Sequence, residues 1–257
     1  MTSAAPGLEA HAYLPYVRSA VAAFDAVLAT GDLDAAVPAC PGWDLRRLTW
    51  HLGDVHRWAR TAIVEGRGDR ETPDGPHERN PLREWFSDGA QALLATLAGT
   101  DPAAPAWSFG EKPRTAAFWF RRQAQESTMH AYDAQASQGA PAPIEAALAL
   151  DGIDEVVRFF FPRQVRLGRM PALTRSLALV PDGVADPDET DGASWVLAGD
   201  GLDGERPAGT DADATVRAPA QALLLLLWQR LDLADAGLRL TGDEAAAHAV
   251  LGARLTP

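Results

Sequence analysis

Apolar residues recur at three- and four-residue steps through the first part of the chain, which is the pattern of amphipathic helices. The first stripe predicts a helix over residues 9–30, and Gly31 is placed to end it in a left-handed cap. A loop rich in proline follows, and Asp44 is then placed to cap a second helix, LRRLTWHLGDVHRWARTAIVEG. Both helices have one apolar face, so each needs a packing partner.

Two further helices complete this region. Asn80 is placed as a cap with Pro81 in the first helical position, and the third helix runs to about Ala98 before Gly99. The fourth helix covers residues 118–135 and reads FWFRRQAQESTMHAYDAQ. Four helices joined by moderately long loops predict a helix bundle, a fold that places metal sites between facing helices.

The pattern changes in the remaining part of the chain. A fifth helix is predicted over about residues 144–161 and is limited by Pro162. After it, LTRSLALVP, SWVLAG, DATVRAP and LRLTG favour strands, whereas APAQALLLLLWQRL and DEAAAHAVLG favour helices. We therefore expect an all-helical domain over residues 1–165 and a small α+β domain over residues 166–257.

The fourth helix has a polar stripe where a core face is expected. Its members are spaced three or four residues apart: Trp119, Gln123, Glu126, His130 and Asp133. Glu126 and His130 lie one turn apart on one face, so a carboxylate and an imidazole can point at one spot. These are two good ligands for a divalent metal, although the same spacing also occurs on solvated helix faces. Asp133 could orient His130 from behind, or be a solvated residue.

A third ligand has to come from another helix. His51 and His56 flank the apolar stripe of the second helix on opposite sides, each roughly 70° from its centre at 100° per residue. Periodicity does not choose between them, and a partly buried, hydrogen-bonded histidine is the alternative interpretation of either.

Composition and charge narrow the possible partners. The formal charge of −12 argues against nucleic acid and anionic membranes as partners. The acidic segments PDGVADPDETDG and DGLDGERPAGTDADA are expected to be solvated loops.

No apolar run approaches the ~20 residues that span a bilayer, and the N-terminal segment does not resemble a secretory signal, so we expect a cytoplasmic protein. The single cysteine, Cys40, excludes an intramolecular disulfide and is interpreted as a structural or incidental thiol. High alanine, arginine and acidic content favours a GC-rich, actinobacterial genome.

Several segments resemble one family. VPACPGWDLRRLTWHLGDVHRWA resembles the N-terminal signature of mycothiol-dependent maleylpyruvate isomerase-like proteins, of the DinB-like metal-binding superfamily, and FRRQAQESTMHAYDAQ resembles their second signature. LDGIDEVVRFF, APAQALLLLLWQR and LRLTGDEAA resemble the junction and the C-terminal domain. The resemblance implies a DinB-like four-helix bundle followed by a small sterol-carrier-like α+β domain.

The resemblance also implies a site. The family's metal, commonly zinc, is held by two histidines and a glutamate, whose positions fall on His51, Glu126 and His130 of this chain. The family often has H-R-W-D-A where this chain has HAYDA, so the arginine of that pattern is missing here. Three protein ligands leave a fourth position open, as in catalytic zinc sites.

The activity implied by the resemblance depends on the thiol cofactor mycothiol. In the family's named reaction the thiolate adds to the double bond of maleylpyruvate, the new single bond rotates, and elimination gives fumarylpyruvate. Arg230 matches an arginine that binds the substrate carboxylate, although a surface arginine at a helix end is the alternative interpretation. Other members are transferases that attach mycothiol to an electrophile, and a bundle that binds metal without catalysis is a third possibility. We expect a small-molecule substrate, an electrophile or unsaturated acid, and a monomer or small homo-oligomer.

Overall fold

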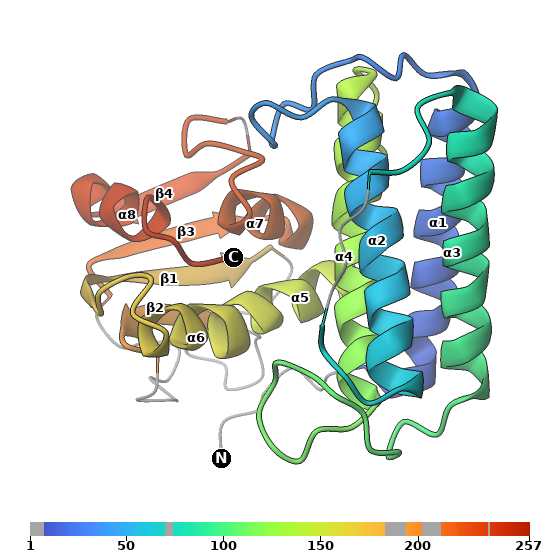
Figure 1. Ribbon diagram of the computed structural model, residues 1–257. Coiled ribbons are helices and arrows are strands. Elements are labelled where there is room, and N and C mark those ends of the chain that lie inside the picture. Colours follow the sequence, from blue (N-terminus) through green and yellow to red (C-terminus); the bar gives the residue numbers. More distant parts are fainter. Residues whose placement is uncertain (1–7, 70–73, 183–193, 202–211, 236) are drawn as a thin grey trace. The chain divides into compact units, whose positions relative to one another are not determined.

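The structure is a computed structural model in which the chain forms two compact units, Leu8–Pro143 and Ile144–Pro257 (Figure 1). It describes residues 8–69, 74–182, 194–201, 212–235 and 237–257. The two acidic segments of the sequence fall largely on residues 183–193 and 202–211, outside the described ranges. Within those ranges, no helix combines the length and apolar character needed to cross a membrane.

The first unit is a bundle of four long helices, which confirms the predicted fold of this region (Figure 1). A single 3₁₀ turn, η1 (Ala10–Tyr13), leads into the bundle, whose helices are α1 (Leu14–Thr30), α2 (Leu45–Val64), α3 (Arg79–Gly99) and α4 (Ala117–Ser137). Helices α1 and α2 each pack against both α3 and α4. Each helix therefore has two neighbours, and α2 and α4 share one interface of the bundle.

The apolar stripes meet in the centre of the bundle. Phe24 of α1 stacks on Phe86 of α3 with ring centroids 4.7 Å apart. The same core contains the fully buried leucines Leu28, Leu45, Leu48, Leu52 and Leu82. Burying one such side chain contributes about 1.5–3 kcal/mol, so this core makes a large favourable contribution to the stability of the helical unit.

Close packing of α2 on α3 fixes the rotation of α2. A Cβ atom at Gly53 would lie only 2.3 Å from the ring of Trp85, so glycine is what allows this approach. Arg57 donates to the carbonyl of Gly53 at 2.8 Å, and its guanidinium lies 4.0 Å from the centroid of the Trp85 ring. This packing determines which side of α2 faces α3 and therefore which side faces α4.

The helix ends agree with the sequence only in part. Asp44 caps α2 as predicted, accepting from the backbone N–H of Arg47 at 2.7 Å. The left-handed cap predicted at Gly31 is wrong, because Gly31 is extended (φ −68°, ψ 161°). The side chain of Gln138 accepts from the next backbone N–H, that of Asp32, at 2.9 Å. This contact comes from a residue more than 100 positions away, so a local pattern could not predict it.

The third helix begins slightly earlier than predicted. It starts at Arg79, with Glu78 rather than Asn80 in the cap position. Pro81 still lies in the first turn, where its missing N–H has no helical partner to lose.

The second unit is a mixed sheet with helices, which confirms the α+β class of the C-terminal region. Its elements are α5 (Ala146–Glu155), η2 (Val156–Phe160), α6 (Phe161–Arg166), β1 (Leu173–Pro181), β2 (Trp195–Gly199), β3 (Ala214–Ala218), α7 (Ala220–Leu227), β4 (Arg239–Gly242) and α8 (Glu244–Leu251). The strand order is β2-β1-β3-β4, with β1 and β3 parallel and both outer pairs antiparallel. Helices α7 and α8 pack on β1 and β3.

The fifth helix differs from its prediction. Pro162 does not end it, because the chain passes through a π-helical turn, η2, and Pro162 then lies in the first turn of α6. Helix α5 packs on α7, so the contacts group it with the sheet. The division between the units therefore lies between Pro143 and Ile144, before the boundary at 165/166 that the sequence suggested.

Candidate metal centre

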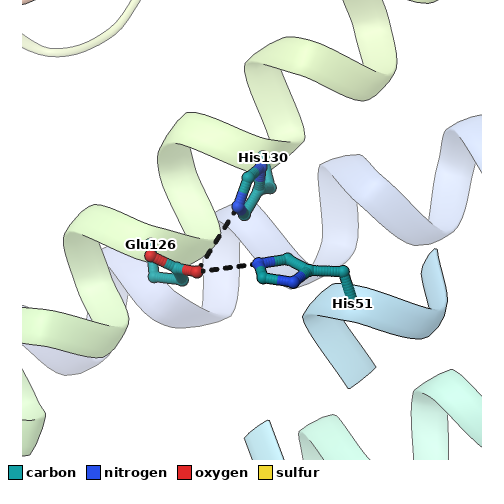
Figure 2. A group of neighbouring side chains, drawn as sticks. All are labelled: His51, Glu126 and His130. Atoms are coloured by element: carbon teal, nitrogen blue, oxygen red, sulfur yellow. Dashed lines mark hydrogen bonds and ion pairs between the residues drawn. The ribbon is translucent and has the colours of Figure 1, made fainter. Parts of the chain in front are cut away.

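Three side chains from α2 and α4 converge at one point of the bundle. Glu126 Oε1 lies 3.2 Å from Nε2 of His51 and 3.4 Å from Nε2 of His130. Figure 2 shows both imidazole rings directed at this oxygen, His51 from α2 and His130 from the same helix as the glutamate. One donor atom from each residue lies within 4.8 Å of the other two. The fold thus brings His51, the histidine selected by the family resemblance, next to Glu126, 75 positions further along the chain.

The antiparallel course of α2 and α4 produces this meeting. His51, in the second turn of α2, lies opposite Glu126, whereas Trp58, two turns later, lies opposite Trp119 with ring centroids 5.1 Å apart. The residue number thus falls along α4 as it rises along α2. The rings of His51 and His130 meet edge to face at 4.9 Å, which brings both imidazoles to one level.

Two buried charged side chains hold the converging groups from behind. Arg122 donates from Nη2 to Glu126 Oε2 at 2.8 Å, and Asp133 Oδ2 lies 3.0 Å from Nδ1 of His130. Arg122 is 4 % exposed and Asp133 only 1 %. Asp133 is therefore not a solvated residue, the alternative interpretation of the sequence, but a buried one that contacts His130. The sequence did not assign Arg122 a role, although its position four residues before Glu126 was a usable signal.

The charges of these neighbours set the protonation of the site. Burial disfavours the ionised form of Glu126, but hydrogen bonds from His130 and His51 and the Arg122 charge outweigh it and hold its pKa well below the usual value. Burial likewise disfavours the imidazolium of His130, but hydrogen bonds to Asp133 and Glu126 outweigh it and raise the pKa to about 9. At neutral pH the site thus holds a carboxylate beside an imidazolium, and a cation that bound through Nε2 of His130 would have to displace its proton.

The donor set fits a divalent metal. Two imidazole nitrogens and one carboxylate oxygen are a ligand set of catalytic zinc sites. Ligand bonds of about 2.1 Å in a tetrahedron place donor atoms about 3.4 Å apart. The two separations from Glu126 Oε1 are close to this, at 3.2 Å and 3.4 Å, and all three donor atoms lie within 4.8 Å of one another. The side chains of His51, Glu126 and His130 are 25 %, 17 % and 12 % exposed, so the three groups are partly open to solvent.

His56, the other candidate on α2, has a different environment. It is fully buried, and its Nε2 lies 3.0 Å from the hydroxyl of Ser127. Burial lowers its pKa to about 3, so the ring is neutral at physiological pH. Its Nδ1 finds no hydrogen-bond partner among the residues that the structure describes. Both histidines thus reach α4, but only His51 reaches Glu126 and His130.

Arg230 belongs to the second unit. It follows α7 and the left-handed residue Gln229 (φ 59°). Its guanidinium donates to the carbonyl of Trp228 at 2.6 Å and lies 5.8 Å from the centroid of the Trp228 ring. A role in substrate binding stays a prediction. Cys40 is half-buried and packs against the bundle core, which suits the structural interpretation.

Comparison with known proteins identifies the family of both units. Residues 14–135 match the family model of the mycothiol maleylpyruvate isomerase N-terminal domain, and residues 147–249 match that of the corresponding C-terminal domain. No curated protein matches the chain.

Two solved structures share the fold. The crystal structure of a mycothiol-dependent maleylpyruvate isomerase is 14 % identical, with a TM-score of 0.61 over 91 % of this chain and 93 % of that chain. A histidine-to-alanine mutant of such an isomerase is 13 % identical, with a TM-score of 0.59 over 85 % and 88 %. At this identity the likeness shows the fold alone, whereas the two domain models together cover most of the chain. The chain therefore belongs to the mycothiol-dependent maleylpyruvate isomerase-like family.

Proposed function

We propose that this protein is a metal-dependent enzyme that uses mycothiol to isomerise a small unsaturated acid about its double bond, as maleylpyruvate isomerase does. The observation that carries the proposal is the convergence of His51, Glu126 and His130 on one partly exposed point, in a chain of this family. Three metal-ligating groups directed at one another inside the bundle are an arrangement that a bound cation would explain.

Each residue of the site has a defined task in this proposal. His51 and His130 would hold a divalent metal through Nε2, and Glu126 would hold it through Oε1. When bound, a metal such as Zn²⁺ supplies an open position at which a thiol loses its proton at neutral pH. Asp133 fixes the ring of His130 through Nδ1, which leaves Nε2 directed at the shared point.

Substrate recognition is assigned to a separate residue. Mycothiol would supply a thiol that adds reversibly to an electron-poor double bond. Arg230 would bind a carboxylate of the substrate, because a planar guanidinium can donate two parallel hydrogen bonds to it. The location in the cytoplasm and the oligomeric state stay predictions.

The test combines metal content with turnover. Purified protein is analysed for bound metal and is then incubated with mycothiol and maleylpyruvate while the cis acid is followed by ultraviolet absorbance. We expect about one metal per chain and isomerisation that requires both metal and thiol. In Glu126→Gln, which keeps the shape but loses the charge, both are expected to be lost. The matched control is His248→Ala, an exposed histidine of α8, which is expected to keep both.

The outcomes separate the alternatives. A protein that binds metal and consumes mycothiol with other electrophiles, but does not isomerise maleylpyruvate, is a mycothiol S-transferase. A protein that binds metal and shows no thiol chemistry is a non-catalytic binding protein. Protein purified and reconstituted without any metal uptake contradicts the proposal altogether.

A further inference from the structure

The two oxygens of Glu126 are used for different purposes. Oε1 faces both imidazoles, at 3.2 Å from His51 and 3.4 Å from His130. Oε2 accepts a hydrogen bond of 2.8 Å from Nη2 of Arg122. Arg122 lies one turn earlier on α4, so the helix itself sets the direction from which this bond comes. The carboxylate therefore presents one oxygen to the shared point.

This division affects what the site can bind. A carboxylate binds a metal through one oxygen or through both, and the second mode occupies an additional position. In this protein the second oxygen already has a charged partner that is 4 % exposed and thus shielded from water. A charge-assisted hydrogen bond of this kind is roughly twice as strong as a neutral one, so Oε2 is held away from the shared point.

A purely structural role explains the pair less well. Burying an arginine and a glutamate carries a desolvation cost that their attraction often fails to repay, and apolar side chains of similar volume are frequently as stable. An arginine next to the ligand residue is therefore a costly choice for packing alone. The position of Arg122 is better explained if its role is to orient the carboxylate of Glu126.

The outer charges on the two sides of the site are opposite. Glu126 is backed by the cation Arg122, whereas His130 is backed by the anion Asp133. An anion behind an imidazole makes its other nitrogen a better donor, and a cation behind a carboxylate makes that carboxylate a weaker one. A metal at this point would thus be bound by a strengthened His130 donor and by a carboxylate whose second oxygen is already engaged.

We propose that Arg122 is a positioning residue that restricts Glu126 to one metal-facing oxygen and so keeps a coordination position free for the thiol. This inference depends on the metal-binding role proposed for the triad. It assigns a task to a residue whose observed contact is with Glu126 Oε2, on the side away from the shared point.

The test replaces the native metal with Co²⁺ in the full-length protein, because the intensity of its visible bands falls as the coordination number rises from four. Arg122→Met removes the charge and keeps the length of the side chain, so Oε2 loses its partner and turns toward the metal. We expect weaker visible bands, and about 10-fold weaker binding of 2-mercaptoethanol measured by its sulfur-to-cobalt absorption. Arg122→Lys, which retains a cation, is expected to restore most of both signals.

The matched control is Arg121→Met, the same change at the neighbouring position about 100° around the helix, and it is expected to keep the wild-type spectrum. If Arg122→Met also keeps the wild-type spectrum and thiol affinity, Arg122 has no positioning role and the inference is wrong. If Arg122→Met does not fold, as judged by circular dichroism, Arg122→Lys and Arg122→Gln provide the same comparison with smaller changes. Wild-type protein that takes up no cobalt overturns the proposed function itself, and this inference with it.

Discussion

Two groups of polar side chains, an upper and a lower layer, lie between α2 and α4, and each contains a histidine from α2 in a very different environment. In the upper layer, His51, Glu126 and His130 are partly exposed and each contacts an ionisable partner. In the lower layer, His56 and Gln123 are fully buried, and His56 Nδ1 and both amide atoms of Gln123 lack hydrogen-bond partners among the described residues. The first layer is partly open to solvent, whereas the second is closed off from it.

The difference shows that environment rather than residue type decides the chemistry of a histidine. Hydrogen bonds to two carboxylates raise the pKa of His130 to about 9 against the effect of burial. Burial without a carboxylate in contact lowers the pKa of His56 to about 3. The two rings belong to one bundle, and their pKa values lie on opposite sides of the ordinary histidine value.

The largest expected effect is on metal binding, which we expect to be lost on substitution of His51 and kept on substitution of His56. His51→Ala removes one of three ligands and is expected to abolish stoichiometric metal uptake, because two remaining ligands rarely hold a divalent ion. His56→Ala is expected to keep about one metal per chain. Elemental analysis of both variants checks this prediction. Metal loss in His56→Ala but not in His51→Ala would show that His56, and not His51, is the ligand.

The next effect concerns the anion behind His130. Asp133→Asn keeps the size of the side chain and removes the charge, so His130 becomes a weaker donor, and metal affinity is expected to fall about 10- to 100-fold. Competition with a chelating dye measures the affinity. Asp88→Asn on the exposed face of α3 is the matched control and is expected to leave the affinity unchanged. Equal affinities in wild type and Asp133→Asn would mean that Asp133 only fills space.

The sequence predicted the bundle well because its helices carry strong apolar stripes. Phe24 and Leu28 of α1 and Leu48 and Leu52 of α2 all lie in the observed core. The polar residues of α4 were equally informative, because polar groups at core positions demand a reason. Periodicity could not choose between His51 and His56, since both flank the same stripe, and the resemblance to the family resolved that choice.

Details that depend on distant contacts were not predictable. The conformation of Gly31 is coupled to Gln138, and the helix at Pro162 continues through a π-helical turn. Arg122 is a different case, because its spacing to Glu126 is visible in the sequence. Whether such a pair is buried, and which oxygen it contacts, depends on packing that only the fold supplies.

A smaller effect is expected on the acid stability of the metal-free protein. The folded-state pKa of His56 is about 3, below its ordinary value of 6.5, so between these values the unfolded chain binds the proton and the folded chain does not. Stability is therefore lost as the pH falls below about 6.5, and by pH 5 this one group accounts for about 2 kcal/mol. Urea unfolding at pH 7 and pH 5 measures the loss, which is expected to be smaller by that amount in His56→Leu. An equal loss in both proteins would show that His56 accepts a proton in the folded state.

The smallest expected effect is a loss of stability on substitution of Ser127, which lies between the two layers on α4. Ser127 follows Glu126 directly, yet its hydroxyl contacts His56 at 3.0 Å. Ser127→Ala removes one buried hydrogen bond and leaves a second nitrogen of His56 without a partner, which is expected to reduce the free energy of unfolding by about 1 kcal/mol. Metal content and affinity are expected to stay at the wild-type level, because the backbone of α4 and the contacts of Glu126 do not change. A large loss of metal in Ser127→Ala would show that the lower layer supports the upper one, and the two would then have to be treated as a single site.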